Sequence, residues 1–193
     1  SYLRTQILPE ALQQESKWDD NLQRIGAGVT GVFEQFCARK FGRVEGAVQS
    51  LDAGVTVAQV AHYPLEQVTA GSLETAGGDT SDVLGQLATL AKESGLVKFT
   101  ARMGTYRDRL HITYDGGFWI DDEVTSQPAG STAVPPDLLS AWVVQCQYQA
   151  ESEDLFGSGA VRPRDTTGRT DPTGFDLVES VERTLKNYRS HKG

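Results

Sequence analysis

The chain has 193 residues, which is enough for one domain with a hydrophobic core. A hydrophobic fraction of 38% and a charged fraction of 23% are typical of a water-soluble protein, and no run approaches the ~20 apolar residues of a membrane-spanning helix. The net charge of -8 is uneven: residues 162–193 hold seven Lys and Arg against five Asp and Glu, and the preceding residues hold eleven against twenty-one. An acidic body argues against tight binding of duplex DNA, which requires basic side chains that displace counterions.

The ends of the chain and its cysteines favour an intracellular protein. The N-terminus lacks the basic and then apolar pattern of a signal peptide, so we expect synthesis in the cytoplasm and no membrane partner. Cys37 and Cys146 lie in separate helical patterns. A disulfide between them is an alternative, but a reducing compartment favours two buried thiols. Neither cysteine has the neighbouring partner of a structural zinc site.

The first strong element is a helix that begins near residue 18. Residues 1–16 form a weaker segment, in which a short helix over 10–14 could follow Pro9. Gly42 is the predicted end of the strong helix. Large apolar residues recur at steps of three and four, which places them on one helix face: Trp18, Leu22, Ile25, Val29, Val32, Phe33 and Phe36.

Strands and turns are predicted from Val44 to Leu73. Pro64 lacks an amide hydrogen, so it restricts the run from Tyr63 to Val68 to a sheet edge or to the beginning of a strand. A loop over 75–81 precedes a predicted short helix over 82–94. The apolar residues of that helix would share one face: Val83, Leu84, Leu87, Leu90 and Ala91.

The next segments form a strand, a turn and a second strand. Leu96 begins the first strand, Gly104–Asp108 is a polar turn, and Leu110–Tyr114 alternates as a strand should. Asp115-Gly116-Gly117 breaks this strand, because glycine permits a positive φ. Residues 121–133 are predicted to be a loop.

A long helix follows from Pro136, a residue favoured in the first helical turn, and Gly157 is its predicted end. Its inward residues are expected to be Leu138, Leu139, Trp142, Val143, Cys146 and Ala150. Residues 158–174 are rich in glycine, proline and arginine and predict a flexible linker. Residues 175–191 regain helical periodicity, with an apolar face and a basic C-terminal end.

No residue pattern predicts catalysis, a metal or a cofactor. His62, His111 and His191 are scattered and share no ligand spacing. The acidic run 121–123 lacks the alternating spacing of a calcium loop and is better explained as a solvated turn. Asp115-Gly116-Gly117 leads to no helix, so it does not predict a phosphate-binding loop. We therefore expect no enzyme activity, no catalytic residue and no cofactor.

These elements predict an α+β fold that is mainly α: a small helical bundle with an inserted β-sheet or hairpin and a C-terminal helical arm. The body is expected to span residues 1–157, with the β insertion at about 44–120. Residues 158–193 would form the linker and the arm.

Four segments, in this order along the chain, resemble motifs of tailed-bacteriophage head–tail connector proteins, also called adaptor or head-completion proteins. Phe36 to Phe41 resembles the end of the first helix in that family, and Tyr63 to Val68 resembles one of its strands. Leu110 to Phe118 resembles a second strand, and Val134 to Trp142 resembles the start of a helix. Together the four segments lie within residues 19–156.

The resemblance implies a structural virion protein at the head–tail interface, present in the host cytoplasm during assembly. Copies would form a homo-oligomeric ring, twelve-fold in this family, around the DNA channel. The portal protein would lie above the ring, a tail, stopper or terminator protein below it, and double-stranded DNA would pass through without sequence-specific binding. The chain departs from shorter family members in an insertion at 71–95 and in its C-terminal arm.

The resemblance also implies that the C-terminal arm binds the portal. The long linker favours an arm over a helix that folds back on its own bundle, although the latter remains the alternative. The predicted portal-binding residues are an apolar stripe and the cations beside it: Phe175, Leu177, Val178, Val181, Leu185, Tyr188, Arg183, Lys186 and Arg189.

Two other function classes remain open at this point. The chain could be a monomeric binding or regulatory module that uses its sheet surface. It could also be a small enzyme whose site is assembled from dispersed carboxylates.

Overall fold

The computed structural model describes residues 19–120, 126–153 and 176–190. The chain divides into two compact units. We call the first the helical unit; it combines Ser1–Ala38 with Pro135–Gly193. The second, the β unit, is the continuous stretch Arg39–Val134. Trp18, Phe175, His191, the acidic run 121–123 and the predicted linker 158–174 lie outside the described residues.

Helix α2, Asp19–Cys37, begins the described part of the helical unit. Its predicted apolar face is buried at Leu22, Ile25, Val29 and Phe33. The helix ends at Cys37 and not at the predicted Gly42, because Ala38 takes a positive φ of 52°. A left-handed residue directly after a helix is a common way to end it, but Ala38 has no side chain that marks this conformation in the sequence.

Helix α3, Pro136–Ser152, begins at the predicted proline. Its buried residues are Leu138, Ala141, Gln145, Cys146, Gln149 and Ala150. Trp142 is half-buried, and its indole N–H donates to the Thr30 hydroxyl of α2 at 3.0 Å. That hydroxyl donates in turn to the Gly26 carbonyl at 2.8 Å. Both cysteines are buried thiols without a disulfide, so this prediction is confirmed.

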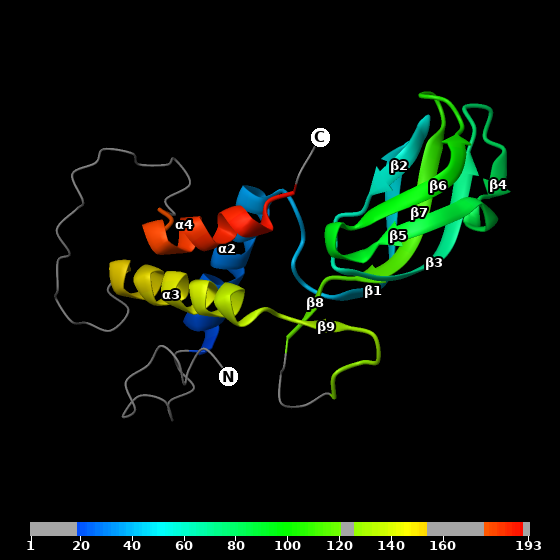
Figure 1. The fold of residues 1–193 in the computed structure, drawn as a ribbon. Coiled ribbons are helices and arrows are strands. Elements are labelled where there is room, and N and C mark those ends of the chain that lie inside the picture. Colours follow the sequence, from blue (N-terminus) through cyan, green and yellow to red (C-terminus); the bar gives the residue numbers. More distant parts are fainter. Residues whose placement is uncertain (1–18, 121–125, 154–175, 191–193) are drawn as a thin grey trace. The chain divides into compact units, whose positions relative to one another are not determined.

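Helix α4, Glu179–Leu185, continues as the 3-10 turn η5, Lys186–Tyr188. It lies beside α3 in Figure 1 and contacts both α3 and α2. Val181 and Leu185 are 1% and 0% exposed, so the apolar face of α4 is part of the helical core. None of the described helices is long and apolar enough to cross a membrane.

Two antiparallel sheets build the β unit (Figure 1). The four-stranded sheet has the order β1-β7-β3-β4, with bounds Val44–Asp52, Arg109–Gly116, Leu65–Glu74 and Thr80–Asp82. The three-stranded sheet has the order β2-β6-β5, with bounds Val55–Gln59, Leu96–Met103 and Leu87–Ala91. Side chains from both sheets form one core, which includes Ala58, Leu65, Val97, Leu110, Ile112 and Tyr114.

Short parallel contacts close the remaining part of the β unit. Strand β8, Phe118–Trp119, pairs with β9, Thr132–Ala133. Isolated bridges join Gly42 to Phe118 and Lys40 to His62. The first and last segments of the β unit therefore lie side by side.

The predicted fold class was wrong, because the chain is a mixed α/β protein and not mainly α. In the part that the structure describes, about 38% of residues are in strands and 34% in helices. The largest single error is the helix predicted over 82–94. That segment contains the end of β4, the 3-10 turns η3 (Leu84–Gln86) and η4 (Lys92–Ser94), and strand β5 between them.

Pairing decides the conformation of this segment. Leu90 and Ala91 lie opposite Val97 and Leu96 of β6, in a ladder that a helix could not form. Gly95 closes the turn with a φ of 64°. A Cβ at Gly95 would come within 2.8 Å of the Tyr63 ring, so the turn requires glycine.

Pro64 lies directly before β3, and the Tyr63–Pro64 peptide bond is cis. Because β3 runs between β7 and β4, the proline marks the beginning of an interior strand, one of the two positions expected for it. The predicted polar turn at Gly104–Asp108 is confirmed by a hydrogen bond from the Asp108 amide to the Thr105 carbonyl at 3.1 Å.

Candidate functional site

The predicted portal-binding residues lie on the described segment 176–190, which packs on the helical unit. Val181 and Leu185 are buried against α2 and α3, and Leu177, Val178 and Tyr188 are half-buried. Arg183, Lys186 and Arg189 are exposed. Phe175 lies outside the described residues.

Gln145 of α3 holds the beginning of this segment. Its side-chain N–H donates to the Asp176 carbonyl at 2.8 Å, and its side-chain oxygen accepts the Val178 amide at 3.0 Å. Gln145 is 1% exposed, and a buried amide that makes both bonds is stabilising, whereas an unpaired one is costly. The sequence shows Gln145 only as a polar residue on a helix, and so this contact was missed.

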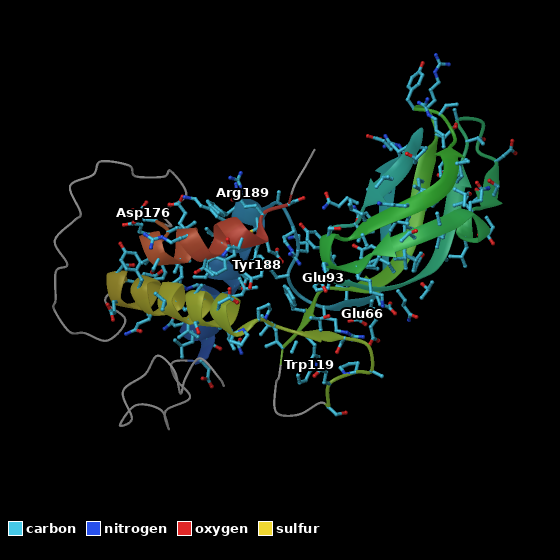
Figure 2. The ribbon with its side chains drawn as sticks, in the orientation of Figure 1. Glu66, Glu93, Trp119, Asp176, Tyr188 and Arg189 are labelled. Carbon is cyan, nitrogen blue, oxygen red and sulfur yellow. The ribbon has the colours of Figure 1, made fainter. Side chains whose placement is uncertain are left out.

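Contacts with the ends of α2 and α3 hold the other end of the segment. The Tyr188 hydroxyl donates to the Asp137 carboxylate at 2.7 Å, and the Ser190 amide donates to the Cys37 carbonyl at 2.8 Å. The Arg189 guanidinium lies 5.4 Å from the centre of the Phe36 ring. Figure 2 shows Asp176 at one end of α4 and Tyr188 and Arg189 at the other.

The exposed cations of α4 are balanced by glutamates of the same helix. Arg183 pairs with Glu179 at 3.1 Å, and Lys186 pairs with Glu182 at 3.1 Å, each one turn apart. Exposed pairs of this kind contribute less than about 1 kcal/mol, so they separate readily when another charge approaches. The segment therefore presents charged residues to solvent and keeps its apolar stripe inside the helical unit.

A second cluster lies in the β unit and joins three of the four motif segments. We call it the Arg39 cluster: Arg39, Phe41, Tyr63 and Phe118. The Arg39 guanidinium carbon lies 3.5 Å from the Tyr63 ring centre and 5.0 Å and 5.3 Å from those of Phe41 and Phe118. Phe41 and Phe118 stack with their ring centres 6.3 Å apart.

Backbone contacts hold the same segments together. Arg39 donates to the Tyr63 carbonyl through its guanidinium, and the Phe118 amide donates to the Phe41 carbonyl at 2.7 Å. Gly117 has a φ of 98°, and a Cβ there would lie 2.3 Å from the Gly42 carbonyl oxygen. The fourth segment joins through the Val134 amide, which donates to the Trp119 carbonyl at 3.0 Å. Residues of all four motif segments are thus connected by contacts in one place, which we call the joint.

Charged residues around this joint are paired. Arg43 makes two hydrogen bonds with Glu66, at 2.7 and 2.9 Å, and one with Glu45 at 2.6 Å; these contacts raise the pKa of the guanidinium. Hydrogen bonds from the Gln67 side chain and the Gly46 amide lower the pKa of Asp115.

Other shifted groups also have structural explanations. The Arg24 guanidinium, which bonds Glu153, lowers the pKa of that carboxyl. Hydrogen bonds from the amide and hydroxyl of Thr105 and from the Ala76 amide lower the pKa of Asp108. Burial raises the pKa of the Cys146 thiol to about 12, which keeps this thiol protonated and unreactive.

The structure does not bring the histidines of the described part together. The His62 ring contacts the Gly42 carbonyl at 2.9 Å, whereas the His111 ring contacts Glu74 at 3.0 Å. Within the described ranges, no group of three or more His, Cys, Asp or Glu residues has the arrangement of a metal site.

Comparison with known proteins reveals similarity of fold. No family model and no curated protein matches the sequence. A chain in the virion of a native gene transfer agent (GTA) particle aligns with 100% of this chain and 89% of its own length, with 17% identity and a TM-score of 0.63. A chain in the neck of an empty GTA particle, computed with C6 symmetry, has the same coverage and TM-score and 16% identity.

A further solved structure is the neck of a native GTA particle computed with C12 symmetry. One of its chains aligns with 90% of this chain and 84% of its own length, with 16% identity and a TM-score of 0.53. This chain therefore has the fold of chains found in the virion and neck of GTA particles.

Proposed function

We propose that this chain is a structural protein of the neck of a phage-like particle, a head–tail connector adaptor. Copies would form a ring around the DNA channel, with the portal on one side and a tail, stopper or terminator protein on the other. The observation that carries the proposal is the full-length similarity of fold to chains in a GTA virion and neck. The four motif segments, identified independently of that similarity, support the same assignment.

The ring is supported by the symmetry of the similar structures, whose necks were computed with C6 and C12 symmetry. A repeated head-to-tail contact between identical subunits gives a closed ring when the rotation between neighbours closes. The acidic chain, with a net charge of -8, is suited to a channel wall past which DNA slides without being held.

Portal binding by the C-terminal segment remains part of the proposal, with different contact residues from those that the apolar stripe predicted. Val181 and Leu185 already stabilise the helical unit, so the contact would use exposed Arg183, Lys186 and Arg189. Opposite charges on the portal would compete with Glu179 and Glu182 for these cations and would guide the encounter more than they add affinity.

The proposal is tested by removing the gene from the genome that encodes it and examining the particles by electron microscopy. We expect DNA-filled heads and separate tails that do not join, and a copy of the gene supplied in trans should restore joined particles. Antibody against a tagged chain should label the neck alone. Normal numbers of joined particles without the chain, or label on the head shell or tail tube, would refute the assignment.

A further inference from the structure

The two outer strands of the three-stranded sheet have an unusual composition. Among the residues that the structure describes, β2 and β5 each pair only with the central strand β6. Both strands are five residues long, Val-Thr-Val-Ala-Gln and Leu-Ala-Thr-Leu-Ala, and neither contains a charged residue or a proline. The sheet therefore has two uncharged edges of equal length.

Uncharged edges are a hazard for a protein that remains monomeric. An edge strand can pair with a strand of another chain, and soluble proteins usually prevent this with charges, proline or a very short strand. The four-stranded sheet has such protection at β4. This strand is only three residues long, ends at exposed Asp82 and directly follows exposed Asp79. In β2, by contrast, Val57 is 40% exposed.

The register shows that the two edges fit one another. Val57, Lys98 and Thr89 lie at one level across the sheet, and all three are exposed. Ala58, Val97 and Leu90 lie at the next level, where Ala58 and Val97 are buried and Leu90 is half-buried. Because β2 and β5 both run antiparallel to β6, they point in the same direction.

We propose that β5 of one copy pairs with β2 of the next copy, as a parallel pair, and that this contact joins neighbouring subunits of the ring. Thr89 would lie beside Val57 of the next copy, and Leu90 beside its Ala58, so that both faces of the sheet continue across the contact. The inference rests on the proposed function, because a ring supplies the repeated neighbour.

Two reasons indicate that the strand pairing with each edge comes from a second copy of this chain and not from a different protein. Each edge has its complement, equal in length and at the same level, on the same chain, whereas a foreign strand would cover one edge and leave the other open. The two edges also differ from one another, so the contact is head-to-tail and closes into a ring when the rotation between copies permits it.

Cross-linking within assembled necks tests the contact. A chain that carries Val57→Cys and Thr89→Cys should give a ladder of covalent multimers with a short bis-maleimide, while each single variant stays monomeric. The natural thiols Cys37 and Cys146 are buried and should not react. The matched control combines Val57→Cys with Ser81→Cys, which is exposed on β4. A ladder with Ser81 and none with Thr89 would overturn the proposal.

Charge exchange gives an independent test. The double variant Val57→Glu with Thr89→Glu should lower recovery of the chain in rings at least tenfold, because two like charges would lie directly opposite each other at every contact of the ring. Lys98 lies beside position 57 within the same chain, so the isolated variant should keep the wild-type circular dichroism spectrum. The pair Val57→Glu with Thr89→Lys, which places opposite charges at the same contact, should form rings as the wild type does.

The outcomes separate the two claims. Wild-type chain that enters no ring in the particle would overturn both the proposed function and this contact. Rings that form normally with Val57→Glu and Thr89→Glu, or that give no covalent multimers with cysteines at positions 57 and 89, would overturn the contact alone.

Discussion

Different interactions stabilise the inside of the helical unit and the inside of the β unit. The helical unit combines segments from both ends of the chain, and its core is the apolar surface shared by α2, α3 and α4. The β unit is one continuous stretch, in which backbone ladders and the Arg39 cluster fix the fold.

The comparison teaches where each unit is vulnerable. In the helical unit, segment 176–190 arrives after a long connection and is held by a few side chains, so its loss would expose the cores of α2 and α3. In the β unit, β7 lies inside the four-stranded sheet and pairs with both β1 and β3, so its backbone is held on two sides.

The largest effect is expected from changes inside α4. Leu185→Ala should lower the free energy of unfolding of the helical unit by about 2–5 kcal/mol, as for other large-to-small core changes. Val181→Asp should cost more, because it buries an unpaired carboxylate. Urea unfolding followed by far-ultraviolet circular dichroism measures both, and Arg183→Ala, on the exposed side of the helix, is the control.

The same argument changes the expectation for a chain without residues 171–193. The sequence predicts that its body stays folded, whereas the buried positions of Val181 and Leu185 predict partial loss of the helical signal. If neither Leu185→Ala nor the truncation alters the unfolding midpoint, the segment is undocked in solution and its apolar stripe is open to a partner.

A smaller effect is expected in the Arg39 cluster. Arg39→Met should destabilise the β unit by about 2–4 kcal/mol, since it removes a buried cation from three aromatic rings and leaves the Tyr63 carbonyl without its charged donor. Hydrogen exchange should accelerate at the Gly117 and Phe118 amides and stay unchanged in α3. Arg102→Met, at an exposed site, is the control. Faster exchange in α3 than in the β unit would contradict the division into two units.

The smallest effect concerns pH. The hydrogen bonds to Asp115 lower its folded pKa below the unfolded value of 3.8, so its contribution is present above that pH and is lost as pH falls through the folded pKa. Asp115→Asn should therefore cost about 1 kcal/mol at pH 6, and the difference from wild type should shrink below pH 3.8. Thermal unfolding at pH 6, 4 and 3 measures this; a constant difference at all three values would assign the effect to geometry and not to charge.

Much of the helical unit could be predicted from the sequence, because a 3.6-residue apolar period and a terminal proline are local signals. They placed the buried face of α2 and the first residue of α3 correctly. Strand β7 and the polar turn before it were also predicted, from alternation and from glycine.

The conformation of residues 82–94 was decided by tertiary structure. Its apolar spacing suits a helix as well as a strand, and pairing with β6 selects the strand. The docking of α4 was likewise decided by partners far away in sequence, namely Gln145, Cys37 and Asp137, none of which has a sequence signature for that role.

The candidate sites divide in the same way. The sequence alone determined that four separated motifs belong together and that 175–191 has an apolar face. Only the tertiary structure decided that three of the motifs meet at Arg39, that the apolar face is covered by α2 and α3, and that β2 and β5 are edges. The physical reason is that helical periodicity depends on residues three or four positions apart, which can be recognised in the sequence. Strand order and the burial of a helix face depend instead on contacts between residues distant in the chain.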